Sequence, residues 1–155
     1  MTVFPLMCAL KRGLVQELSD FLLPDADRNG SVSYPSLPPA VYIGSLPSKT
    51  DENQVPFVLI QDLGGSLLSD KVQSVKIAFR CAVQAEDIED ACDLHNLMSR
   101  VASYCAGTQT VPLEGRYRLG FWEGDRLIDW GRPDGQAQPY QEGVILTRWE
   151  LPAGI

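Results

Sequence analysis

Two consecutive stretches in the middle of the chain restrict its fold more than any other feature. Residues 55–63, VPFVLIQDL, form an almost continuous apolar run, which is typical of an interior strand covered on both faces. Residues 72–84, VQSVKIAFRCAVQ, alternate between apolar and polar, so one face of a second strand is apolar. We therefore expect a β-hairpin with a long connection, Asp62–Lys71, in which Gly64 and Gly65 mark a turn. The apolar face of the second strand comprises Val75, Ile77, Phe79, Cys81 and Val83.

Two stretches with the period of an amphipathic helix flank this hairpin. The first covers 5–23 and ends before Pro24, and the second covers 87–106 and has acidic residues in its first turns, where the helix dipole favours them. Their apolar stripes are Leu10, Leu14, Leu18, Phe21 and Leu22 in the first helix, and Ile88, Ala91, Leu94, Met98, Val101 and Cys105 in the second.

The remaining strand-like stretches are 40–44, 115–123 and 143–151, separated by polar connections that include 25–39 and 124–138. The order is then helix, three strands, helix, two strands. This order predicts an α+β fold in which two helices pack on a largely antiparallel β-sheet. The length of 155 residues suits a single domain, 1–155.

Composition narrows the function classes. A net charge of −7 argues against binding to nucleic acid phosphates, because such binding depends on clustered Lys and Arg. No apolar run approaches the ~20 residues that span a bilayer, and the first basic residues follow a short apolar stretch, so we expect neither membrane insertion nor an export signal. The four cysteines, at 8, 81, 92 and 105, lack the spacing of a zinc site and suit thiols in a reducing cytosol.

The stretch DADRNG, 25–30, resembles the start of a calcium-binding EF-hand loop, with Asp25, Asp27 and Asn29 at the ligand positions. An EF-hand also needs a bidentate Glu at its twelfth position, but that position is Ser36. The prolines around Ser36 prevent a helix from starting there. Asp, Asn and Gly are also ordinary turn residues, so we interpret 25–39 as a variable polar loop and expect no metal site.

The only histidine, His95, lies in the second predicted helix near Asp90 and Asp93. Its position away from the apolar stripe favours a solvated or interface residue over a general base. The chain contains neither the G-x-S-x-G motif of hydrolases nor the H-E-x-x-H motif of zinc proteases, and a P-loop lysine does not follow Gly64 and Gly65. We expect no catalytic residues and no cofactor, although a small-molecule-binding or hydrolytic domain that uses His95 stays open as an alternative.

The succession of segments is more informative than any motif. The leucine-rich first helix is followed by LPPAVYIG (37–44), VPFVLIQ (55–61) and the long alternating strand, then by DLHNLMSRV (93–101), GRYRL (115–119) and PYQEGVILTRWELP (139–152). This succession resembles the small tail-terminator, or tail-completion, proteins of long-tailed phages and prophages. The last segment is the most specific, and the likeness covers most of 5–152, with 25–39 and 124–138 fitting least well.

The resemblance implies a non-catalytic α+β subunit that forms a homo-oligomeric ring, usually a hexamer. Such a ring caps the tail tube, ends its polymerisation and provides the surface for joining the head, so the implied partners are the tail tube protein and the head–tail connector protein. DNA passes through the ring without specific binding. The protein would act in the host cytoplasm during assembly and then in the virion tail. Another neck or head–tail connector component is the alternative within the same class.

Long connections without secondary structure usually serve function, so we expect the ring contacts in Asp62–Lys71 and Gly124–Gln138. Exposed acids would repel DNA phosphates within roughly 8 Å at physiological salt, which makes Asp62 and Asp70 candidates for a channel face. The tryptophans at 122, 130 and 149 suit core or interface packing. The candidate interface residues are Asp62, Gly64, Gly65, Asp70, Lys71 and Trp130.

Overall fold

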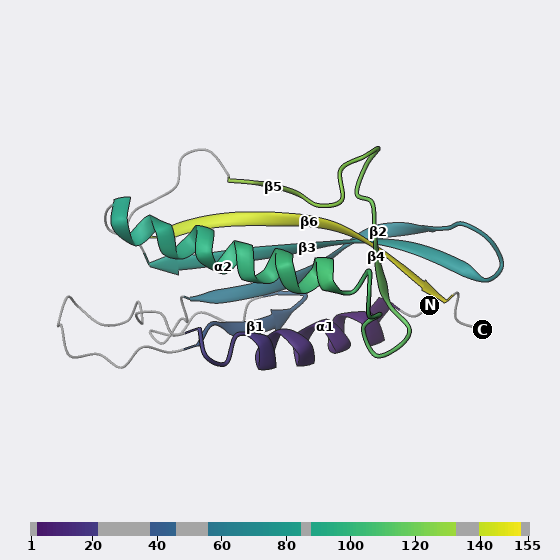
Figure 1. The fold of residues 1–155 in the computed structure, drawn as a ribbon, viewed down its shortest axis with the longest axis horizontal. Coiled ribbons are helices and arrows are strands. Elements are labelled where there is room, and N and C mark those ends of the chain that lie inside the picture. The colour runs from purple at the N-terminus through teal and green to yellow at the C-terminus, as the bar shows by residue number, and fades with distance from the viewer. Residues whose placement is uncertain (1–2, 22–37, 46–55, 85–87, 133–139, 153–155) are drawn as a thin grey trace.

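The computed structural model describes residues 3–21, 38–45, 56–84, 88–132 and 140–152. It confirms the α+β class, with two helices and a mixed, six-stranded sheet in this part of the chain (Figure 1). The helices and strands are α1 (Val3–Glu17), β1 (Ala40–Ile43), β2 (Phe57–Leu67), β3 (Val72–Gln84), α2 (Ile88–Gly107), β4 (Arg118–Gly120), β5 (Asp129–Gly131) and β6 (Tyr140–Pro152).

The strand order is β1-β2-β3-β6-β4, and β5 also pairs with β6. β1 runs parallel to β2, whereas all the other pairs are antiparallel, as the largely antiparallel prediction required. β4 and β5 pair with successive stretches of β6, at 148–150 and 144–146. β6 therefore has β3 on one side along its whole length and two short strands on the other.

Both helices pack on the same face of the sheet, where their stripes form one core with the apolar face of β3. α1 lies over β1 and β2, and α2 lies over β3 and β6. The predicted β3 face is confirmed residue by residue, because all of its five apolar side chains are buried. The buried stripe residues are Leu10, Leu14 and Leu18 of the first helical segment and Leu94, Met98, Val101 and Cys105 of α2.

The start of β2 is covered on both faces, as its continuous apolar run predicted. Val58 and Ile60 belong to the main core, while Phe57 and Leu59 form a smaller cluster with Ala82 on the opposite face. The buried part of β2 ends at Ile60, because the residues from Asp62 onward are exposed.

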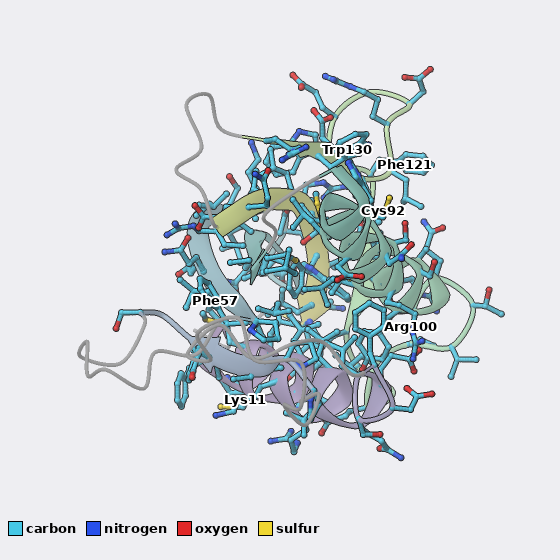
Figure 2. All side chains as sticks on the ribbon, turned by 90° about the vertical axis from the view of Figure 1, so that its left-hand side faces the viewer. Lys11, Phe57, Cys92, Arg100, Phe121 and Trp130 are labelled. Atoms are coloured by element: carbon cyan, nitrogen blue, oxygen red, sulfur yellow. The ribbon has the colours of Figure 1, made fainter. Side chains whose placement is uncertain are left out.

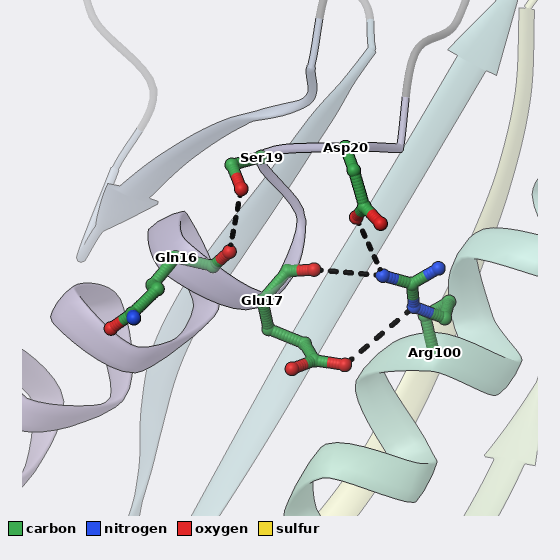
Figure 3. Close-up of polar contacts among 5 residues, drawn as sticks. All are labelled: Gln16, Glu17, Ser19, Asp20 and Arg100. Carbon is green, nitrogen blue, oxygen red and sulfur yellow. Dashed lines mark hydrogen bonds and ion pairs between the residues drawn. The ribbon is translucent and has the colours of Figure 1, made fainter.

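α1 ends earlier than predicted, at Glu17 instead of residue 23. Side chains bind the carbonyl groups that the last turn leaves without helical partners (Figure 3). The Ser19 hydroxyl donates to the Gln16 carbonyl at 2.8 Å, and Arg100 of α2 donates to the Glu17 carbonyl at 2.8 Å. Arg100 also forms an ion pair with Asp20 at 2.8 Å. The Arg100 contacts fasten the end of α1 to α2.

The prediction of a long loop between β2 and β3 is wrong, because most of that segment is strand. β2 continues to Leu67 and pairs with β3 as far as Leu67 opposite Gln73, with a β-bulge between Asp62 and Gly64. Only residues 68–71 connect the two strands. Ser69 organises this short turn, because its hydroxyl accepts from the backbone N–H groups of Lys71 and Val72 at 3.2 Å each.

Gly64 and Gly65 therefore lie within a strand and not in a turn. Gly64 has a φ of +101°, which side chains rarely tolerate, and its N–H donates to an Asp62 carboxylate oxygen at 2.7 Å. A Cβ on Gly65 would lie 2.2 Å from the Ser74 carbonyl oxygen on β3. The two glycines permit the bulge and the close approach of the strands that follows it.

Two further boundaries differ from the predictions. The strand expected over 115–123 is only Arg118–Gly120, and the connection expected over 124–138 contains β5. Three residues are too few to show a period of two, so β5 has no clear signal in the sequence. Among the residues that the structure describes, no helix has the length and hydrophobicity to cross a membrane.

Candidate functional site

The hairpin of β2 and β3 extends past both helices at one end of the molecule (Figure 1). We call residues 62–72 the hairpin tip. Its four large apolar side chains are exposed: Leu63 by 51%, Leu67 by 67%, Leu68 by 56% and Val72 by 37%. Four exposed apolar side chains within eleven residues differ from the scattered single ones that are normal on a protein surface. They make the tip a candidate contact surface.

The tip also carries a strand edge with which no other described strand pairs. β1 pairs with β2 only from Phe57 to Ile60. From Gln61 onward, no other described strand lies on that side of β2. An unpaired edge offers backbone donors and acceptors to another chain. The glycine bulge and the acidic side chain of Asp62 limit such pairing, in the manner that natural sheets use to protect their edges.

The structure brings five of the six candidate interface residues together at the hairpin tip. Asp62, Gly64 and Gly65 lie at the bulge, and Asp70 and Lys71 lie in the turn. The leucines and the valine of the tip were missed in the sequence. Their available signal was the Leu67–Leu68 pair between serines, since two adjacent apolar residues cannot both face one side of a strand.

Trp130, the sixth candidate, lies elsewhere. It is 59% exposed on β5, and Figure 2 places it beyond α2, on the side of the molecule away from Lys11 on α1. The Trp130 and His95 rings meet edge to face, with centroids 6.0 Å apart and planes at 89°. This contact joins β5 to α2.

A groove of about 230 Å³ runs between these two elements. We call it the α2–β5 groove. Its polar side chains are His95 and Ser99, and the rest of its lining is apolar apart from the indole nitrogen of Trp130. The side chains that form it include His95, Met98, Ser99, Ala102, Ile128 and Trp130.

A second hollow of about 390 Å³ lies against β5 and β6. Its lining includes Arg80, Arg132 and Glu142. Arg80 forms an ion pair with Glu142, whereas the Arg132 guanidinium donates to the neutral amide oxygen of Gln141. Arg132 follows Trp130 by two residues along the chain, and it lines this second hollow and not the α2–β5 groove.

The hydrolytic alternative gains little from this geometry. His95 is exposed, and Asp93 lies about 200° around the helix from it, given 3.6 residues per turn. Asp93 does not line the groove. The described residues contain no group of three or more His, Cys, Asp or Glu side chains that could hold a metal ion. The rejected calcium ligands Asp25, Asp27 and Asn29 lie outside the described residues, so that interpretation stays a prediction.

No family model matches the chain, and no curated protein matches its sequence significantly. The tail-terminator resemblance therefore rests on the sequence segments alone.

Proposed function

We propose that this chain is a structural virion assembly protein, a tail terminator that caps the phage tail tube, ends its polymerisation and provides the head–tail joining surface. The observation that supports it best is the hairpin tip, where Leu63, Leu67 and Leu68 are all more than half exposed. A tip of this kind suits a protein whose function is to contact other subunits. The segment pattern supplies the link to phage tails.

The energetics favour a covered tip. Burying a leucine fully contributes about 1.5–3 kcal/mol, so covering the exposed half of each tip leucine would contribute on the order of 1 kcal/mol per residue. Several such side chains together outweigh the contribution of a typical exposed ion pair, about 0–1 kcal/mol. The tip is therefore a stronger source of association energy than the charged groups around it.

In the proposed assembly, copies of the chain form a ring, and the ring contacts the tail tube protein on one side and the head–tail connector protein on the other. A tip that binds a different patch on the next copy makes a heterologous contact, which gives a ring when the rotation closes. The net charge of −7 suits a channel through which DNA slides without binding. Of the two candidates for its lining, Asp62 is the one that we assign to the channel, because Asp70 lies in the turn of the hairpin tip and suits a contact with a neighbouring subunit.

The test is made on phage particles produced without this protein. We expect tails of irregular, excessive length or tails that fail to join heads. Supplying the wild-type chain should restore infectious particles. Normal infectious particles made without the protein would refute the proposal. Tails of normal length that lack heads would instead indicate a neck or connector component.

A matched pair of variants tests whether the tip is involved. Leu68→Asp places a charge on the hairpin tip, and Val111→Asp places one at a surface position that is 73% exposed and far from the tip in sequence. Both chains should fold, because neither side chain is buried. We expect only Leu68→Asp to fail in restoring particles, and equal restoration by both variants would exclude the tip as the contact surface.

A further inference from the structure

We propose that the hairpin tip of one subunit docks in the α2–β5 groove of the next subunit, with Asp70 of the tip facing Arg132. This inference rests on the proposed self-assembly and names the surface that receives the tip. The occupant of the groove is a second copy of this chain.

The hairpin tip cannot reach the α2–β5 groove of the same subunit. Trp130 pairs with Ile145, and Ile145 pairs with Phe79 of β3. Phe79 is seven residues from Val72, which at about 3.3 Å per residue corresponds to roughly 23 Å along the strand. The tip and β5 also extend in opposite directions along the molecule (Figure 1). Contact between tip and groove must therefore join two subunits.

The groove fits an inserted side chain better than a free small molecule. Its volume of about 230 Å³ is below the ~300–1,000 Å³ of ordinary small-molecule sites. An exposed Trp beside a Met is a combination that protein interfaces favour, because the indole supplies contact area and the thioether adapts its shape. A leucine of the tip supplies the complementary apolar group.

Charge complementarity sets the orientation of the hairpin tip in the groove. Asp70 follows Leu68 by two residues, and Arg132 follows Trp130 by two residues. In the proposed docking a tip leucine contacts Trp130 and Asp70 faces Arg132, whose described partner, the Gln141 amide, is neutral. An opposite-charge pair at the rim of an apolar contact fixes its orientation and speeds association. The contact joins unlike surfaces, as a ring requires.

The test uses disulfide capture between two full-length variants in a background in which Cys8 and Cys92, the cysteines outside the buried core, are replaced by Ser. One variant carries Leu68→Cys at the tip, and the other carries Ser99→Cys in the groove. The control pair combines Val111→Cys with Ser99→Cys. Both pairs are oxidised at equal protein concentrations, and mixed dimers are quantified with time by non-reducing gel electrophoresis and mass spectrometry.

We expect mixed dimers of the tip–groove pair to form roughly tenfold faster than those of the control pair, because docking raises the local thiol concentration even when association is weak. Arg132→Asp in the groove variant should slow capture about twofold to fivefold, the range of an exposed ion pair. Asp70→Lys in the tip variant should then restore the rate.

Equal capture of the two pairs, or tip-to-tip dimers of Leu68→Cys that form as fast as the mixed dimers, would overturn the docking inference. The outcome is separable from the proposed function. Lost capture together with defective tails would leave the tail role standing without this contact. Rapid capture together with normal particles lacking the protein would leave the contact standing without the tail role.

Discussion

Thr147→Val should destabilise the protein although the two side chains have nearly the same shape. Thr147 is fully buried in β6. Its hydroxyl donates to the Ile77 carbonyl of β3 at 2.7 Å and accepts from the indole N–H of Trp149 at 2.8 Å. Trp149 is fully buried as well, so water cannot take over the lost bond. Valine can neither donate nor accept.

The structure sets the size of this effect. Among the described residues, every buried side-chain nitrogen and oxygen has a hydrogen-bond partner, so the substitution creates an orphan that the wild type lacks. A buried donor left without a partner costs about 1–3 kcal/mol. We expect the free energy of unfolding to fall by that amount, which corresponds to a melting temperature lower by roughly 2–12 °C in a chain of this size.

The assay is urea denaturation followed by circular dichroism, in which the midpoint should fall while the m-value stays constant. Trp149→Phe provides the control background, since phenylalanine has no N–H to leave unsatisfied. There, Thr147→Val should cost less, and the double-mutant cycle should give a coupling energy of about 0.5–3 kcal/mol. The same cost in both backgrounds, or an unchanged midpoint in the single variant, would refute the reasoning.

Three further predictions concern the core. Leu94→Ala should lower the free energy of unfolding by about 2–5 kcal/mol in denaturant titrations, because Leu94 is fully buried between α2 and the sheet. Gly13→Ala should lower the melting temperature despite alanine's helix propensity, because its Cβ would lie 1.7 Å from the Tyr104 hydroxyl and displace a ring that packs against the core. A raised melting temperature would show that the Tyr104 ring moves aside without cost. Burial raises the pKa of the Cys81 thiol from 9.0 to about 12, and it also raises the pKa of Cys105. Because these thiols ionise more readily in the unfolded chain, the free energy of unfolding should fall as pH rises from about 9 towards 12. In native protein both thiols should resist a thiol reagent that labels Cys8 and Cys92, the two cysteines outside the core.

The parts of the fold that were predicted correctly are those with long periodic patterns. β3 begins and ends where its thirteen-residue alternation does, Val72–Gln84. α2 shows the predicted stripe wherever its side chains are described. A period of many residues averages out individual exceptions, and burial of one face then follows from side-chain direction alone.

The hairpin connection was predicted wrongly because glycine is compatible with two different local structures. Gly64 and Gly65 permit a turn, but they also permit a bulge and a close strand approach. Only the pairing partner distinguishes these cases, and that partner is β3, beyond the turn. β5 was missed for a related reason, since three residues become a strand only when β6 lies beside them.

For the candidate site, too, some features follow from the sequence and others only from the tertiary structure. The sequence by itself determined the fold class and the core faces of β3 and α2. Its indication of a contact surface near Asp62 and Asp70 stays a prediction. Only the tertiary structure decided that Leu67 is exposed, because an apolar residue in a strand is buried or not according to where the covering helices end. It also decided that His95 and Trp130, far apart in the chain, form one groove. Local periodicity specifies the direction of a side chain, whereas the neighbours it meets depend on long-range strand pairing that no local pattern encodes.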